Sequence, residues 1–162
     1  MLSALPAEAQ RVVTTAADSG SSGDGECTLR EALGGTAGGD CPNNGDASTI
    51  HFNIPGTGPH VIQLNSGFTL TSQKTIDGST QPGAADVCNL AIPDRPDYQI
   101  ILDGGDSADN AFFAGSSNPS GTTIRGLNIR NFRGSAIRFT QVNNAKIECN
   151  FIGTDETGTL DM

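Results

Sequence analysis

The chain has 162 residues, which suits a single domain, and its 18 acidic against 9 basic residues give a formal net charge of −9. This balance argues against a nucleic-acid-binding protein, because phosphate binding needs a basic stripe. Twenty-one glycines and eight prolines indicate many turns, as in a protein of short strands. No run of about 18 apolar residues occurs, so no membrane span is predicted.

Residues 1–10 are interpreted as a residual signal or linker segment. Within them, Ala7-Glu8-Ala9 resembles the small-residue end of a secretory signal whose basic and apolar parts are missing. An ordinary Ala-rich tail explains the same residues as well.

Residues 11–48 are predicted to hold one strand and one short helix among polar loops. The β-branched side chains of residues 11–15 favour the strand. Thr28 followed by Glu31 has the spacing of a capping box, in which each side chain satisfies a main-chain N–H at the helix N-terminus. Gly34-Gly35 ends the helix after one or two turns.

So short a helix is not stable alone and must dock on an apolar surface. Leu29 and Leu33 lie four residues apart and are predicted to form its buried face.

The four cysteines contain no C-x-x-C pair, so their spacing fits no zinc site. An even number favours an oxidised, exported protein with one of three disulfide connectivities. Cys27 with Cys41 is the local pairing, and Cys88 with Cys149 follows by elimination. A free, buried Cys149 is the alternative.

Short strands dominate from Thr49 to Met162. Apolar and polar residues alternate in the first of these strands, which predicts one buried and one solvated face. Residues 79–97 interrupt the pattern with prolines, a cysteine and charges, and are interpreted as an excursion. The predicted rungs comprise residues 50–54, 62–64, 68–70, 100–113, 124–139 and 147–152.

One apolar-polar-small unit recurs every 22 to 26 residues, as Ile76-Asp77-Gly78, Leu102-Asp103-Gly104, Ile124-Arg125-Gly126 and Ile147-Glu148-Cys149. Such a period is typical of a solenoid, in which each repeat contacts mainly its neighbours. The sequence therefore predicts an all-β coil of parallel strands.

Two sets of motifs carry a family resemblance. Residues 13–18 and 25–33 closely resemble the CSLREA N-terminal module of bacterial exported proteins, with Thr28 in place of Ser and an early Gly34-Gly35. Residues 75–78, 126–129 and 150–155 resemble the repeats of right-handed parallel β-helices in the pectate-lyase-like superfamily.

This resemblance implies a right-handed parallel β-helix in which residues 11–48 cap the N-terminal end and residues 49–162 form rungs. It also implies a bacterial protein that is secreted or displayed at the cell surface. We expect a non-catalytic, structural role for the segment.

Residues 153–159 resemble a corner after which more rungs follow. The resemblance thus implies that the chain is the N-terminal piece of a longer protein, or that two copies cover each other's open ends. The expected partners are further β-helix rungs or a second copy, and possibly a polysaccharide.

Catalysis is the alternative, because parallel β-helices often carry polysaccharide lyases and hydrolases. A lyase acting on acidic glycans needs carboxylates that hold Ca²⁺ and a basic residue, and a hydrolase needs two carboxylates. The candidates are Asp77, Asp103, Arg125 and Glu148, predicted to form one row, with a basic patch of Arg130, Arg133 and Arg138 beside it.

Such residues more often form the turns at the corners of a coil or pair their charges across successive rungs. A catalytic site is therefore not favoured. Ca²⁺ is the one cofactor considered. A glycan- or surface-binding adhesin segment is a third hypothesis.

The remaining polar and aromatic residues are interpreted as structural. His51 and His60 lack a third metal ligand in register. Asparagines are expected at left-handed corners, where their amides can join successive rungs. An internal stack is predicted for Phe68, Phe112, Phe113, Phe132, Phe139 and Phe151.

Overall fold

A computed structural model describes residues 10–34, 40–41, 48–84, 88, 98–155 and 159–162. The described residues are mostly β, with one short helix, α1 (Leu29–Gly34), and one 3₁₀ turn, η1 (Gly78–Thr80). The strands are β1 (Gln10–Val13), β2 (Thr49–Phe52), β3 (His60–Gln63), β4 (Phe68–Thr69), β5 (Thr75–Asp77), β6 (Ile100–Asp103), β7 (Phe112–Ala114), β8 (Thr123–Arg125), β9 (Asn128–Arg130), β10 (Ile137–Phe139), β11 (Lys146–Glu148) and β12 (Phe151–Ile152). The proposed signal remnant, Ala7-Glu8-Ala9, lies outside the described residues.

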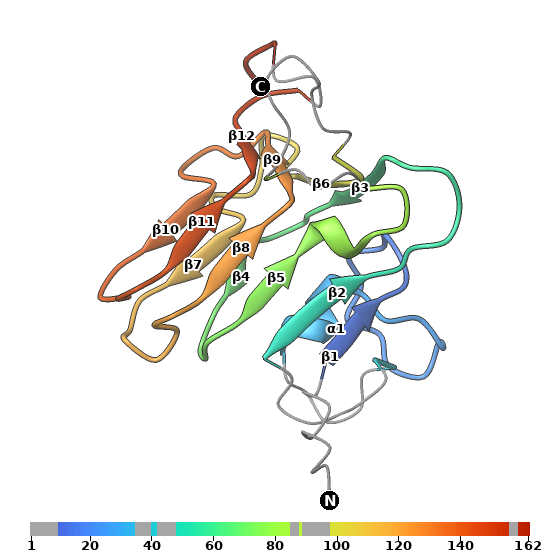
Figure 1. Ribbon diagram of the computed structural model, residues 1–162, viewed down its shortest axis with the longest axis horizontal. Helices are drawn as coiled ribbons and strands as arrows, with labels where there is room; N and C mark the ends of the chain where they lie inside the picture. Colours follow the sequence, from blue (N-terminus) through green and yellow to red (C-terminus); the bar gives the residue numbers. More distant parts are fainter. Residues whose placement is uncertain (1–9, 35–39, 42–47, 85–87, 89–97, 156–158) are drawn as a thin grey trace, which may run out of the picture.

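The strands form three parallel sheets, which confirms the all-β class. Sheet A has the order β1-β2-β5-β8-β11, sheet B the order β12-β9-β6-β3, and sheet C the order β10-β7-β4. Every pairing between these strands is parallel. From β2 onward the chain visits sheets A, B and C in that order and then begins again, and Figure 1 shows the strands of sheet A side by side.

We call each passage through the three sheets a layer: β2-β3-β4, β5-β6-β7, β8-β9-β10 and β11-β12. Register stacks like residues between layers. Ile50, Ile76, Ile124 and Ile147 form one column in sheet A. The prediction that Leu102 belongs to this column is wrong, because Leu102 lies in sheet B.

The misassigned repeat has a simple physical origin. The connection between η1 and β6 lies within one layer, so β5 and β6 are successive strands of that layer. The 26-residue step from Ile76 to Leu102 therefore crosses from one sheet to another and only resembles a layer-to-layer period.

The first part of the predicted excursion is hydrogen-bonded to the preceding layer. The Gln81 amide accepts from Ile54 N and donates to Ile54 O, both at 2.8 Å. Residues 85–87 and 89–97 of the excursion lie outside the described residues.

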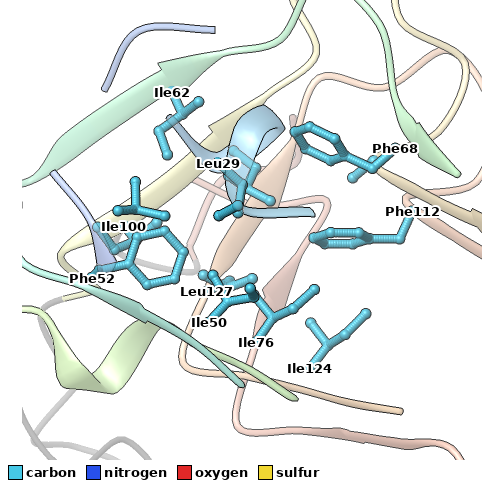
Figure 2. Packing of buried hydrophobic residues seen from close by; sticks show 14 of the residues in the cluster. Leu29, Ile50, Phe52, Ile62, Phe68, Ile76, Ile100, Phe112, Ile124 and Leu127 are labelled. Atoms are coloured by element: carbon cyan, nitrogen blue, oxygen red, sulfur yellow. The ribbon is translucent and has the colours of Figure 1, made fainter. Parts of the chain in front are cut away.

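The space enclosed by the three sheets is filled with apolar side chains. Figure 2 shows Ile50, Ile76 and Ile124 of sheet A facing this core, and each of them is fully buried. In sheet C, Phe68 stacks over Phe112 with ring centroids 5.7 Å apart. Each fully buried side chain of this size stabilises the fold by about 1.5–3 kcal/mol relative to exposure.

Helix α1 covers the core at the β1–β2 end of the stack (Figure 1). Leu29 is 1% exposed, and Leu33 is half-buried against the same core. The predicted capping box is present: Glu31 N donates to Thr28 Oγ1 at 3.1 Å, and Thr28 N donates to the Glu31 carboxylate at 3.0 Å. Arg11 of β1 is buried and donates to the main-chain carbonyls of Glu31 and Ala32. The helix is therefore docked at both its apolar face and its C-terminal carbonyls.

In the last two of the recurring units, the third residue forms a left-handed corner between sheets A and B. Gly126 has a φ of +71°, and Cys149 takes the same position with a φ of 55°. A Cβ atom on Gly126 would lie 2.5 Å from Ser79 N, so the close packing of layers excludes a side chain there. Asn150 then joins two layers, because its amide accepts from Leu127 N at 3.0 Å and donates to Ile124 O at 2.9 Å.

Both predicted disulfides are formed. Cys27 is bonded to Cys41, and Cys88 is bonded to Cys149. The alternative of a free Cys149 is therefore wrong.

A search of the described residues found no helix with the length and apolar character needed to cross a membrane.

Candidate functional site

The predicted row of charged residues is divided between two sheets. Asp77, Arg125 and Glu148 do align in sheet A, with Arg125 in the middle. Asp103 instead lies in sheet B, in register with Arg130. Of the four candidate residues, Asp77, Arg125 and Glu148 thus lie in one row, and Asp103 is on another sheet.

Asp77 serves the turn that follows it. Its carboxylate accepts from Ser79 N at 3.0 Å and from the Ser79 hydroxyl, and so caps η1. Its other neighbour is Arg125, whose Nε lies 3.5 Å from Asp77 Oδ1. An aspartate that caps the following turn and lies beside an arginine of the next layer has the arrangement expected of a structural residue.

Asp103 is 7% exposed and saturated with donors. It accepts hydrogen bonds from Arg130 Nε at 3.1 Å, from the Asn131 amide at 3.0 Å and from Gly105 N at 2.9 Å. Burial raises the pKa of the Asp103 carboxyl, but the bonds from Gly105, Asn131 and Arg130, with the charge of Arg130, outweigh it and hold the pKa below its ordinary value. A carboxylate kept ionised in this way is a poor general acid.

The two histidines lie on different sheets. His51 belongs to β2 in sheet A and His60 to β3 in sheet B. Within the described ranges, no group of three or more His, Cys, Asp and Glu side chains has the geometry to hold a metal ion.

A polar groove runs along the outer side of sheet C, over the loops that connect sheets B and C. It consists of two adjoining hollows of about 360 Å³ each, which share Asp109 and Asn110. The first extends toward the cap and is lined by residues 65–69, 107–110 and Phe113. The second extends toward the last layer and is lined by Asp109, Asn110, Arg133, Gly134, Ser135 and Arg138. Volumes of this size fall in the range of small-molecule sites.

The outward column of sheet C forms the floor of the groove. Thr69, Phe113 and Arg138 are in register on successive strands. Phe113 lies between two fully buried neighbours, so its own side chain points outward, and it is half-exposed. The prediction that Phe113 belongs to the internal stack is therefore wrong, because strand alternation puts only one of two adjacent residues inside. The Arg138 guanidinium carbon lies 6.0 Å from the Phe113 ring centroid.

The arginines on and near sheets B and C fall into two groups. Arg30 of α1 forms a two-pronged ion pair with Asp18, at 2.8 and 2.9 Å, and also lies 4.7 Å from the Phe68 ring centroid. Arg130 of the predicted basic patch is occupied by Asp103. Arg133 and Arg138, by contrast, make no ion pair with any residue in the described part of the chain, and both are exposed.

Sequence reasoning thus found the arginines of the groove but misjudged their setting. It missed Asp109, Asn110 and the outward position of Phe113. The signal for Phe113 was strand geometry, because the adjacent Phe112 and Phe113 of one strand must point to opposite faces of the sheet. For Asp109 and Asn110 no local pattern exists, since their place depends on how three loops stack.

Comparisons of the chain with family models, with curated proteins and with solved structures gave no match in any of the three. Function is accordingly inferred from the geometry of the fold and of the groove.

Proposed function

We propose that the chain forms the N-terminal cap and first coils of an exported bacterial protein with a right-handed parallel β-helix, in which it has a structural role. The observation that carries this proposal is the docking of α1 over one end of the core, where Leu29 and Ala32 are fully buried. A stack of layers exposes its interior at each end, so a stable stack needs a cap.

The β-helix itself is supported by the cyclic order of the three parallel sheets. Crossover connections between parallel strands are right-handed in almost all proteins, which favours a right-handed coil. The two disulfides are compatible with an oxidising, extracellular location.

The opposite end of the stack differs from the capped end. Ile147 is 41% exposed and Ile152 is 45% exposed, and the outer edges of β11 and β12 pair with no strand among the described residues. We propose that another coil covers this edge, supplied by further rungs or by a second copy of the chain. Light scattering coupled to size exclusion tests the second option, which a monomer at high concentration contradicts.

A polysaccharide lyase or hydrolase is less well supported. Asp77 lies in an ion pair with Arg125, at 3.5 Å, and caps η1, whereas Asp103 is held by Arg130 on another sheet. This dispersal favours the structural role over catalysis.

The cap role is tested by comparing the full chain with a version lacking residues 1–48. We expect the shortened chain to aggregate, because β2 becomes a free edge and the core loses its cover. A version lacking residues 1–9 is the matched control and should remain cooperative in thermal unfolding. A well-folded, monomeric chain without residues 1–48 would refute the cap role.

Catalysis is tested separately by following the absorbance of unsaturated products on a panel of polyuronates, with and without Ca²⁺. We expect no turnover. Turnover that Asp103→Ala abolishes without loss of fold would establish an enzyme instead.

A further inference from the structure

The free edge of sheet A has a charge pattern that is its own complement. β11 is the last strand of this sheet, at the end away from α1 (Figure 1), and it consists of Lys146, Ile147 and Glu148. All three side chains are exposed. A basic and an acidic residue stand on either side of Ile147, so the strand matches a reversed copy of itself.

The backbone of β11 directs its unpaired groups outward at Ile147. Lys146 N donates to Thr122 O at 2.8 Å, so the backbone of Lys146 faces β8. Successive residues of a strand direct their N–H and C=O groups to opposite sides. The N–H and C=O of Ile147 therefore point away from β8, where no strand among the described residues pairs with them. Two antiparallel strands exchange both hydrogen bonds at such a position.

Charges on the outer face of sheet A alternate along one column. Asp77, Arg125 and Glu148 are in register on successive strands, and Arg125 Nε lies 3.5 Å from Asp77 Oδ1. A second β11, paired about a twofold axis at Ile147, would put its Lys146 next to Glu148. The column would then read negative, positive, negative, positive. Opposite charges that face each other across antiparallel strands stabilise the pairing, whereas like charges weaken it.

The apolar interior of the stack favours the same pairing. Ile147 ends the core column of Ile50, Ile76 and Ile124, and it is 41% exposed whereas the other three are fully buried. A second copy at this edge would bring its own Ile147 against the first and remove both side chains from water. Burial of apolar surface is the main driving force of protein association.

The described residues that follow β12 leave this edge free. Thr154 and Asp161 form an antiparallel bridge, and Met162 N donates to Gly153 O at 2.9 Å. These residues thus turn back beside β12, and none of them pairs with β11.

We propose that two copies of the chain pair through β11 in antiparallel orientation, with Lys146 of each copy opposite Glu148 of the other. Sheet A then continues from one copy into the next. This inference rests on the proposed function, in which another coil covers the open end, and it names a second copy as that cover. The contact uses the same surface of both copies, so it closes as a dimer and does not extend into a filament.

Sedimentation equilibrium of the full chain, over a range of concentrations and at low ionic strength, measures the Kd of the dimer. We expect a monomer–dimer equilibrium that weakens as salt is added, because salt screens exposed charges. Lys146→Glu and Glu148→Lys each convert both ion pairs of the dimer into like-charge pairs. Each variant should therefore raise the Kd about tenfold or more.

Charge exchange separates this register from a general effect of charge. An equimolar mixture of the Lys146→Glu and Glu148→Lys proteins should form a heterodimer about as tight as the wild-type dimer, because the mixture restores both opposite-charge pairs. The double variant Lys146→Glu, Glu148→Lys should form a homodimer for the same reason. Glu26→Lys makes the same charge change in the exposed loop before α1, and as the matched control it should leave the Kd within about twofold.

The fold of each variant is checked by circular dichroism and by urea unfolding at concentrations well below the Kd. The unfolding midpoints should agree closely, because the side chains of Lys146 and Glu148 are exposed in a single copy.

A folded monomer at every concentration would overturn the pairing. It would leave the cap role intact, since that role is tested by removing residues 1–48, and further rungs would then be the cover of the open end. A dimer that neither single reversal weakens, or a mixture that does not regain the affinity lost by its two components, would overturn the register.

Discussion

Arg11 Nη1 lies 2.8 Å from the main-chain carbonyl oxygen of Ala32, so the first strand holds the C-terminal end of the only α-helix in the described residues. A second bond from the same nitrogen reaches Glu31 O at 3.1 Å. The last carbonyls of a helix have no partner within the helix and carry partial negative charge. A buried guanidinium therefore satisfies acceptors that would otherwise be desolvated without compensation.

Substitution of Arg11 should destabilise the cap. We expect Arg11→Met to lower the free energy of unfolding by about 1.5–3 kcal/mol, because it removes charge-assisted hydrogen bonds to buried carbonyls. Urea denaturation measures the change. Lys146→Met, which removes an exposed charge, is the control and should change stability by less than about 0.5 kcal/mol. Equal stability of the Arg11 variant and the wild type would show that these bonds contribute nothing.

The apolar face of α1 gives a second test of docking. Leu29→Ala should cost about 2–5 kcal/mol, the range for a leucine that is removed from a packed core. Leu33→Ala should cost less, because Leu33 is half-buried whereas Leu29 is 1% exposed. Thermal unfolding of the two variants compares them, and the reverse order would contradict the position of the helix.

Asp103 should make stability depend on acid pH. Its pKa in the folded state lies below the ordinary value, so the unfolded chain binds a proton at a pH where the folded chain does not. The stabilising contribution is complete above the unfolded pKa, which is about 3.9, and is lost as the pH falls through the folded pKa. Unfolding of Asp103→Asn and the wild type should therefore differ most above about pH 5, and the difference should shrink as the pH falls toward the folded pKa. A difference that is constant over this interval would exclude the linkage.

Tyr98 allows a direct titration, because it is the only tyrosine in the chain. It is 4% exposed, its ring lies 4.4 Å from that of Phe151, and its hydroxyl donates to Cys149 O at 3.2 Å. Burial raises the pKa of Tyr98 to about 12. Tyrosinate absorbance of the folded protein should therefore appear at a pH about two units higher than that of the urea-unfolded chain.

The same shift predicts alkaline destabilisation. A raised folded pKa contributes stability that is complete below about pH 10 and is lost as the pH rises toward the folded value. Tyr98→Phe should lack this part of the pH dependence. Ionisation of the folded protein at the same pH as the unfolded chain would show that Tyr98 is solvated.

The two disulfides should differ in reactivity and in their effect on stability. Cys27 and Cys41 are 1% and 4% exposed, whereas Cys88 is exposed and Cys149 is half-buried. Mild reductant under native conditions should therefore open Cys88–Cys149 first, as alkylation and mass spectrometry would show. The sequence separations are 61 and 14 residues, so the chain-entropy model gives about 4 kcal/mol for Cys88–Cys149 and about 3 kcal/mol for Cys27–Cys41.

Serine double variants measure these contributions by urea denaturation. Earlier reduction of Cys27–Cys41 would contradict the burial of that bond. Free thiols at all four positions in the purified protein would remove the support that the disulfides give to an exported location.

Local patterns predicted the parts of the fold that depend on neighbours in the chain. The capping box needs only Thr28 and Glu31, and the alternation around Ile50 needs only one strand. The pairing of Cys27 with Cys41 closes a short loop, so proximity in sequence made it the simplest choice. These features follow from helix and strand geometry acting over a few residues.

The candidate site was harder to predict, because its residues come from separate layers. The sequence placed Asp103 in a row with Asp77, yet the structure pairs it with Arg130. The spacing of the repeat does not reveal that the connection between η1 and β6 lies within one layer. That connection decides that Asp103 belongs to sheet B and not to sheet A.

By itself, therefore, the sequence determined the class of structure: short parallel strands with one buried face and a docked helix. Only the tertiary structure decided which side chains meet. It separated Phe113 from the core, placed Arg133 and Arg138 beside it without an ion pair to any described residue, and joined their loops into one groove. The physical reason is that each of these contacts depends on the register between layers, which is set by the packing of the whole core and not by any single segment.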